Sequence, residues 1–158
     1  MMFRSLAFAA LLALTALSAS ADSLQPRDGW VVMETNKGFD QLITDLKAAT
    51  KAQGMAVVTQ AGPTAAAARR GITIPGNRVI GVFNNDFAVR ILATSTSAMI
   101  EAPIRFYVTE NPDGQATLSY KIPSHVFAPY MGEGGSELVK LAEELSQVFD
   151  AIARQASR

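Results

Sequence analysis

The chain contains a single histidine, and this residue is the one best suited to acid–base chemistry near neutral pH. His125 lies in the segment Pro123–Phe127, and an isolated imidazole can accept or donate a proton in that range. A catalytic triad would also need a serine held by a base, together with a carboxylate. Ser124 and Glu133 lie close to His125 in sequence, but no Gly-x-Ser-x-Gly motif is present. The pattern does not predict a catalytic residue, and a surface or capping role for His125 is the alternative.

Metal chemistry is the second possibility that the residue types raise. His125 and Met131 lie six residues apart, and imidazole and thioether ligands together suit copper(I). Methionine, however, is ordinarily a filler of hydrophobic cores. The chain has no cysteine, which excludes disulfides, thiolate nucleophiles and thiolate metal sites. Copper binding at His125 and Met131 is therefore kept only as an alternative, and no cofactor is predicted.

A polar face on a predicted hairpin is the third candidate. In the hairpin Ile104–Ile122, Arg105 and Tyr107 alternate with apolar residues and so share one face of the strand. This face is either exposed to solvent or part of a shallow pocket for a small polar or anionic ligand. In the second case Asn84 and His125 would join Arg105 and Tyr107 as ligand-binding residues. A third alternative is that the face is buried in a dimer, where tyrosine and arginine are favoured.

The elements that must position these residues follow from periodicity and turn chemistry. Strands are predicted at 29–35, 55–59 and 77–84, the second as a short apolar inner strand. Helices are predicted from Phe39 to Gly54 and over 65–70.

The second half of the chain has equally clear signals. A helix is expected from Phe87 to about Ser95, with Asp86 as its N-cap. The sequence 111–114, Asn-Pro-Asp-Gly, predicts the turn of an antiparallel hairpin. A long amphipathic helix begins near Ser136. The predicted order is β-α-β-α-β-α-β-β-α, which is typical of an α+β domain with helices packed on a mixed β-sheet in two layers.

Residues 1–21 have the three regions of a cleaved signal peptide. Arg4 supplies a positive start, Leu6–Leu17 is almost wholly apolar, and Ala19–Ala21 provides a small-x-small cleavage site. The apolar run is too short to span a bilayer, which takes about 20 residues. We therefore expect cleavage near Ala21 and a periplasmic or secreted protein.

Residues 22–158 have the length of one domain with a substantial core. Lysine and arginine number 14, as do aspartate and glutamate, and a basic run is absent, so nucleic-acid binding is not expected. No later segment is apolar enough for a membrane span, and there is no cysteine to carry a lipid anchor. We expect a soluble domain without a stable membrane anchor.

The order and spacing of these elements resemble the domain-of-unknown-function 302 family. The resemblance rests on Gly38-Phe39-Asp40 opening a helix, Gly54 ending it, a strand that closes in Phe83-Asn84, and the strand Pro103–Val108 before an acidic-glycine turn. It covers about residues 32–123, and the last helix is also similar. It implies a compact α+β fold, often a dimer, with a polar spot around Asn84, although Asn85 stands where the family usually carries proline. It implies no reaction, because the family has no assigned activity.

These observations favour an exported, homodimeric binding or interaction module that is not an enzyme. The alternative is a small-ligand-binding protein or enzyme with a polar cleft at the hairpin, formed by Asn84, Arg105, Tyr107 and His125. A copper-binding periplasmic protein is a second alternative. A concave pocket on which those side chains converge would favour the ligand-binding alternative, whereas a flat polar face or a large apolar patch would favour an interaction module.

Overall fold

The computed structural model describes residues 24–158, so the predicted signal peptide lies outside the described part of the chain. In chain order the elements are β1 (Trp30–Gly38), α1 (Phe39–Ala52), β2 (Ala56–Ala61), α2 (Thr64–Ala68), β3 (Asn77–Phe83), α3 (Asn85–Thr94), η1 (Ser97–Glu101), β4 (Ile104–Glu110), β5 (Gln115–Lys121), α4 (Pro123–Phe127), η2 (Ala128–Tyr130) and α5 (Met131–Ser157). The predicted α+β class and the order of the main elements are confirmed. The short helices η1, α4 and η2 are additions that the sequence analysis did not predict.

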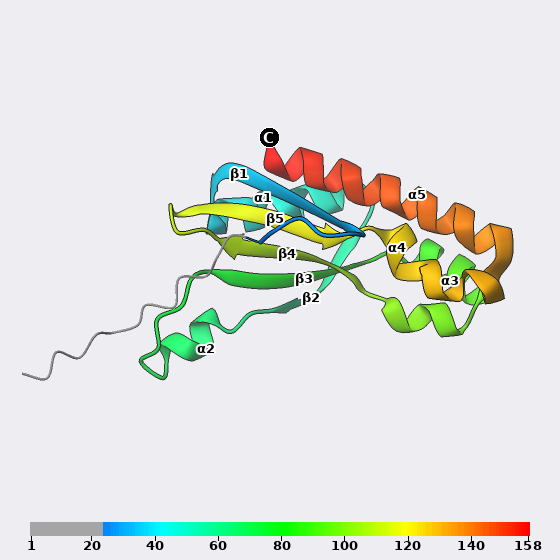
Figure 1. Ribbon diagram of the computed structural model, residues 1–158, viewed down its shortest axis with the longest axis horizontal. Helices are drawn as coiled ribbons and strands as arrows, with labels where there is room; N and C mark the ends of the chain where they lie inside the picture. Colours follow the sequence, from blue (N-terminus) through cyan, green and yellow to red (C-terminus); the bar gives the residue numbers. More distant parts are fainter. Residues whose placement is uncertain (1–23) are drawn as a thin grey trace, which may run out of the picture.

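The five strands form one sheet in the order β1-β5-β4-β3-β2 (Figure 1). Every neighbouring pair is antiparallel, which corrects the expectation of a mixed sheet. That expectation rested on helices between successive strands, a pattern typical of parallel crossovers. Here α1 instead carries the chain from β1 at one edge of the sheet to β2 at the other, so the strands it joins never become neighbours.

The prediction that the run after Gly54 forms an inner strand is wrong. Strand β2 lies at the edge and pairs only with β3. Most of its residues are exposed, and Val58 keeps 49 % of its surface accessible. The valine-rich run is equally typical of inner and edge strands, because strand propensity does not record how many neighbours a strand has.

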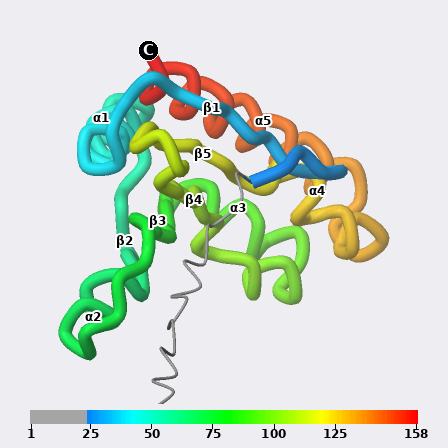
Figure 2. Tube along the Cα trace, turned by 60° about the vertical axis from the view of Figure 1, so that its left-hand side comes forward, coloured from blue at the N-terminus to red at the C-terminus, as the bar shows by residue number. Residues whose placement is uncertain are grey.

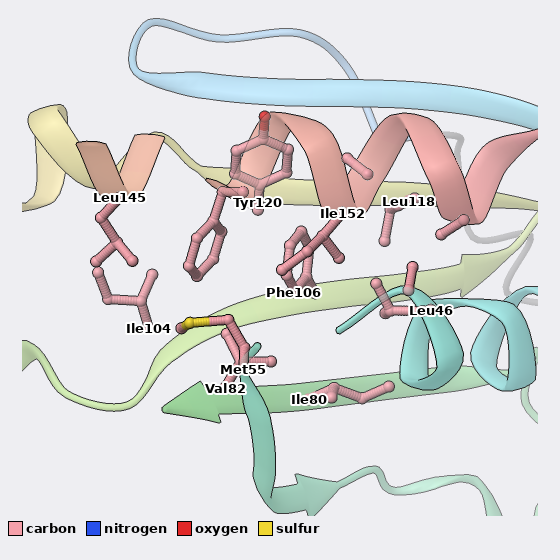
Figure 3. Packing of buried hydrophobic residues seen from close by; sticks show 14 of the residues in the cluster. Leu46, Met55, Ile80, Val82, Ile104, Phe106, Leu118, Tyr120, Leu145 and Ile152 are labelled. Carbon is pink, nitrogen blue, oxygen red and sulfur yellow. The ribbon is translucent and has the colours of Figure 1, made fainter. Parts of the chain in front are cut away.

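A layer of helices covers one face of the sheet, with α1 and α5 running side by side (Figures 1 and 2). Alternation along β4 turns Ile104, Phe106 and Val108 into the core beneath this layer, as predicted. Figure 3 shows Phe106 and Tyr120 from the sheet near Leu145 and Ile152 of α5. The other face of β4 carries Arg105 and Tyr107.

Helix α5 contains the predicted apolar stripe and joins two helices across a kink at Gly135, which has a φ of 60°. The long amphipathic helix therefore begins near Ser136, as predicted, and a short helical segment from Met131 precedes it. Within residues 24–158, no helix combines the length and the hydrophobicity needed to cross a membrane.

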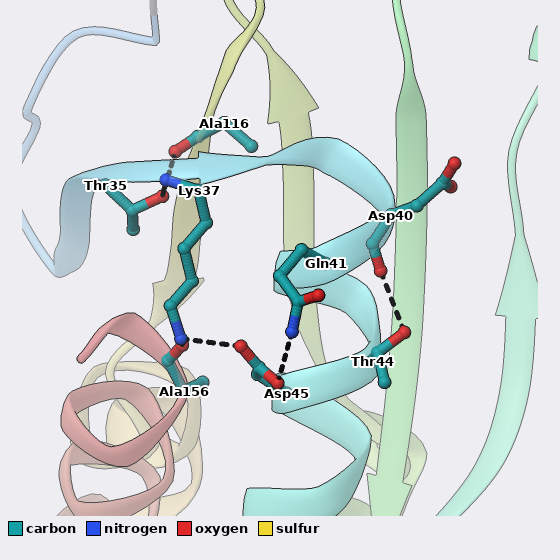
Figure 4. Close-up of polar contacts among 8 residues, drawn as sticks. All are labelled: Thr35, Lys37, Asp40, Gln41, Thr44, Asp45, Ala116 and Ala156. Atoms are coloured by element: carbon teal, nitrogen blue, oxygen red, sulfur yellow. Dashed lines mark hydrogen bonds and ion pairs between the residues drawn. The ribbon is translucent and has the colours of Figure 1, made fainter.

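A polar cluster joins β1 to the two long helices (Figure 4). Lys37 donates hydrogen bonds to Asp45 Oδ2 at 2.6 Å and to the carbonyl oxygen of Ala156 at 2.8 Å. Hydrogen bonds from Gln41 and Lys37 hold the pKa of Asp45 below its ordinary value. The ammonium group also lies at the C-terminal end of α5, where a positive charge is favourable. These contacts fix the end of the sheet that lies far from His125.

Tyr120, the buried tyrosine of β5, is expected to make the folded protein less stable at high pH. Burial raises the pKa of Tyr120 to about 12 from 10.0, and the charge of Asp150 adds to the shift. Because the folded state favours the neutral phenol, its contribution to stability is complete below pH 10 and is lost as the pH rises through 12. Between these limits we expect the free energy of unfolding to fall by about 2 kcal/mol more than in Tyr120→Phe. Urea unfolding of both proteins across this range tests this, and equal losses would contradict it.

Candidate ligand-binding site

A cavity of about 560 Å³ lies at the end of the sheet near η1 and α4. Three of the four residues predicted to bind a ligand line it, namely Arg105, Tyr107 and His125. Trp30, Lys121 and Glu101 add further polar or aromatic groups, and the remaining walls are mainly apolar. We call this space the sheet-face cavity.

Antiparallel register explains why the strand residues meet there. Trp30 of β1 lies directly opposite Lys121 of β5, and Tyr107 of β4 lies opposite Ser119 of β5. Directly opposite residues in an antiparallel pair share a face of the sheet. The alternation that turns Phe106 into the core therefore turns this set toward the other face.

His125 reaches the cavity through a short helix at the end of β5. Pro123 occupies the first turn of α4, where its missing N–H costs nothing, and the backbone N–H of His125 donates to the carbonyl oxygen of Ile122 at 2.9 Å. The imidazole then packs directly against the backbone of Gly29, at the point where any other residue would place its Cβ. Gly29 also has a φ of 73°, a conformation that favours glycine. The missing Cβ and the positive φ of Gly29 together allow His125 to lie beside the first residue of β1.

Hydrogen bonds orient two further groups at the cavity. The side-chain amide of Asn77 donates to the hydroxyl oxygen of Tyr107. Tyr130 donates its hydroxyl to Glu101 Oε1 at 2.7 Å, and this hydrogen bond raises the pKa of Tyr130. Tyr107 is thereby held in place, and one oxygen of the only carboxylate that lines the cavity is already occupied.

Positive charge gathers at the same place. Arg27 lies 5.2 Å from the centroid of the Trp30 ring, and the ammonium nitrogen of Lys121 lies 5.6 Å from it, which are cation–π distances. Arg105 is exposed on the adjacent strand. Among the ion pairs of residues 24–158, none includes Arg27, Arg105 or Lys121. The cavity thus presents cations that form no ion pair with any carboxylate of the described chain.

Asn84 does not line the sheet-face cavity. Its side-chain oxygen accepts hydrogen bonds from the backbone N–H groups of Asp86 and Phe87, at 2.9 and 3.1 Å, so Asn84 is the N-cap of α3. This corrects the prediction that Asp86 caps the helix. The amide nitrogen of Asn84 also donates to the carbonyl oxygen of Gly54 at 2.9 Å, and thereby links α3 to the turn before β2.

Copper binding by Met131 and His125 stays an alternative prediction. Met131 begins α5 and packs against the hydrophobic core, whereas His125 lines the sheet-face cavity. In the described part of the chain, no group of three or more His, Cys, Asp or Glu side chains is arranged to hold a metal ion.

Trp30, Lys121 and Glu101 were not among the predicted ligand-binding residues. Lys121 was detectable, because it alternates with Leu118 and Tyr120 on the polar side of its strand. Trp30 and Glu101 carry no such signal, since their place depends on the pairing of β1 with β5 and on the unpredicted helix η1.

A second hollow of about 600 Å³ lies at the opposite end of β4, beside Arg78 and Glu110. Glu110 already accepts a hydrogen bond of 2.6 Å from the backbone N–H of Gly76. Asp40 places a negative charge at the start of α1, which borders this hollow. The sheet-face cavity is the better candidate site because three of the four predicted residues converge on it.

Fold and cavity together define a small α+β domain with a candidate ligand site on the sheet face opposite its helices. The family model described as "Domain of unknown function DUF302" matches residues 31–154, and the chain belongs to this family. The resemblance noted from the sequence is thus confirmed.

A solved structure shows the same fold. The crystal structure of an uncharacterized conserved DUF302 protein from Bacillus stearothermophilus superposes with a TM-score of 0.72 at 16 % identity, covering 84 % of this chain and 100 % of that chain. At this identity the similarity establishes the fold alone. No curated protein matches the sequence.

Proposed function

We propose that this protein is an exported binding protein that holds a small organic anion in the sheet-face cavity. The observation that carries the proposal is the convergence of Arg105, Lys121 and His125 on one concave space, with neither of the two cations in an ion pair with any of residues 24–158. A concave pocket favours a ligand-binding protein over an interaction module with a flat polar face. The expected homodimer stays a prediction.

The charged residues at the end of the paired part of β4 and β5 favour an anionic ligand over a neutral one. Phe106 lies opposite Tyr120, where the pairing of β4 with β5 ends, and Arg105 and Lys121 are the next residue of each strand. Like charges that lie close together on neighbouring strands destabilise a sheet. A bound anion between the two side chains would offset this repulsion and would replace the missing carboxylate partner.

Binding rather than catalysis is supported by the surroundings of His125. A general base that activates a nucleophile is held in hydrogen-bond reach of a hydroxyl or thiol, and is itself oriented by a third group. The hydrogen bonds made by Tyr107 and Glu101 go to Asn77 and Tyr130, and neither joins the imidazole. His125 lines the cavity, where its imidazole can donate a hydrogen bond to a ligand.

Export is supported by the sequence of residues 1–21, which contains a positive start, an apolar run and a small-x-small site in order. A domain without cysteine is compatible with an oxidising compartment, because it has no thiol to protect. We propose that the domain that binds the anion begins at Asp22.

Native mass spectrometry tests the proposal. The full chain is produced in a cell that exports it and is purified under gentle conditions. The expected spectrum shows a chain that begins at Asp22 and carries an added small organic mass. The added mass is expected to be lost in Arg105→Ala, because this change removes a cation from the cavity.

Two controls make the result specific. Arg69→Ala removes an equally exposed arginine away from the cavity and should keep the added mass. Asn84→Ala should also keep it, although loss of the helix cap lowers stability by about 1 kcal/mol. A spectrum of the unmodified protein without any added mass, or an added mass that survives Arg105→Ala, would overturn the proposal.

A further inference from the structure

We infer that the anion bound in the sheet-face cavity carries a planar aromatic ring, so that the ligand class is an aromatic carboxylate. This inference rests on the proposed function and deepens it. It follows from the aromatic residues that line the cavity and from the position of the cations relative to them.

Tyr107 and Trp30 form an aromatic surface across β5. Ser119 of β5 lies directly opposite Tyr107 of β4 and Val32 of β1. Lys121, the next residue of β5 on the same face, lies opposite Trp30. Ser119 is small, yet only 1 % of its surface is accessible. Neighbouring side chains therefore cover Ser119, and both Tyr107 and Trp30 line the cavity.

Both aromatic side chains are held in place before any ligand arrives. The hydrogen bond from Asn77 fixes the hydroxyl of Tyr107, and the cations of Arg27 and Lys121 flank the ring of Trp30. Binding to groups that are already ordered costs less conformational entropy than binding to mobile ones. Planar rings gain from fixed aromatic partners through offset or edge-to-face contacts, by about 0.5–1.5 kcal/mol beyond the area they bury.

The cations lie where the acidic group of such a ligand would be. Lys121 lies opposite Trp30 of β1, and Arg105 comes directly before Phe106, where the pairing of β4 with β5 ends. A carboxylate that binds both cations would bring its attached ring beside Tyr107, two residues along β4 from Arg105. Ile104, Val79 and Val126 supply apolar walls for the edges of that ring. The volume of about 560 Å³ falls in the range of pockets that enclose small organic molecules.

Tryptophan fluorescence provides a direct test, because Trp30 is the only tryptophan of the chain and lines the cavity. The purified, exported protein is titrated with benzoate, with cyclohexanecarboxylate and with benzamide. The second probe keeps the charge but is not planar, and the third keeps the ring but is neutral. We expect saturable quenching by benzoate, with an affinity at least about tenfold higher than for either analogue, which is a difference of about 1.4 kcal/mol.

A pair of variants isolates the aromatic contact. Tyr107→Leu should reduce the preference for benzoate over cyclohexanecarboxylate to near unity, while Trp30 remains as the reporter. Phe87→Leu likewise replaces an aromatic ring by leucine, but on α3 and outside the cavity, and should keep the preference.

The outcomes separate this inference from the proposed function. Equal binding of benzoate and cyclohexanecarboxylate, weakened in both cases by Arg105→Ala, would overturn the aromatic class and leave anion binding intact. Equal binding of benzoate and benzamide, unchanged by Arg105→Ala, would overturn both. Absence of saturable quenching by all three probes would overturn the inference, while the native mass spectrum decides the proposed function independently.

Discussion

Phe149→Ala is expected to lower the free energy of unfolding by about 3–5 kcal/mol, the usual range for truncating a buried phenylalanine. Phe149 is fully buried in α5. Its ring stacks on Phe106 with centroids 4.7 Å apart and lies 5.6 Å from the ring of Tyr120. Alanine removes the ring from between helix and sheet and leaves a cavity that the antiparallel strands cannot close. Urea unfolding near neutral pH gives the measurement.

A neighbouring residue supplies the control for Phe149. Gln147 lies on the same helix and is exposed, so Gln147→Ala should change stability by less than about 0.5 kcal/mol. Phe149→Leu keeps most of the volume and should cost clearly less than alanine. A loss in Phe149→Ala as small as that in Gln147→Ala would show that α5 does not pack on the sheet as described.

Gly29→Ala is the second change with a large expected effect, because it acts on the backbone and on the candidate site together. A side chain at the φ of 73° costs about 1–2 kcal/mol by itself. The new Cβ would also meet the imidazole of His125, and forced overpacking typically costs a further 1–3 kcal/mol, roughly. We expect a total loss of about 2–5 kcal/mol in the free energy of unfolding, measured by urea unfolding.

Gly54 is a matched control for the backbone part of this effect. Its φ is 71°, and a Cβ there would meet no atom within 4 Å, so Gly54→Ala should show the backbone cost alone. Combining Gly29→Ala with His125→Ala removes the imidazole and should return the loss to the value for Gly54→Ala. If Gly29→Ala and Gly54→Ala destabilise equally, His125 does not rest on Gly29, and its place in the cavity is wrong.

Local features of the fold were predictable because short-range chemistry determines them. The turn at 111–114 joins an antiparallel hairpin, with Gly114 at a φ of 80°. Gly54 and Gly71 take positive φ values after α1 and α2, as their positions next to helix ends indicate. The apolar stripe of α5 is likewise buried as predicted. Each of these features depends on residues within a few positions of one another.

The predictions from sequence are wrong where a contact with a distant residue decides between two structures that the local sequence allows equally. Asn84 and Asp86 are both good N-caps, and Asn84 is the one that also reaches the carbonyl oxygen of Gly54, 30 residues away. The valines of β2 suit an inner or an edge strand equally, and only the strand order places them at the edge. Whether neighbouring strands run parallel or antiparallel likewise depends on which distant strands pair.

The candidate site likewise combines features that local sequence predicts with features that depend on contacts between distant segments. Residue types and their alternation are enough to place Arg105 and Tyr107 on the polar face of a hairpin, because alternate residues of a strand point the same way, and to exclude cysteine chemistry. That His125, Trp30 and Lys121 join them and that Asn84 does not follows from long-range packing. Side-chain alternation is a property of a single strand. The cavity, by contrast, requires β1 to pair with β5 and the imidazole of α4 to rest on Gly29. These contacts join segments that lie up to about a hundred residues apart, which local sequence cannot specify.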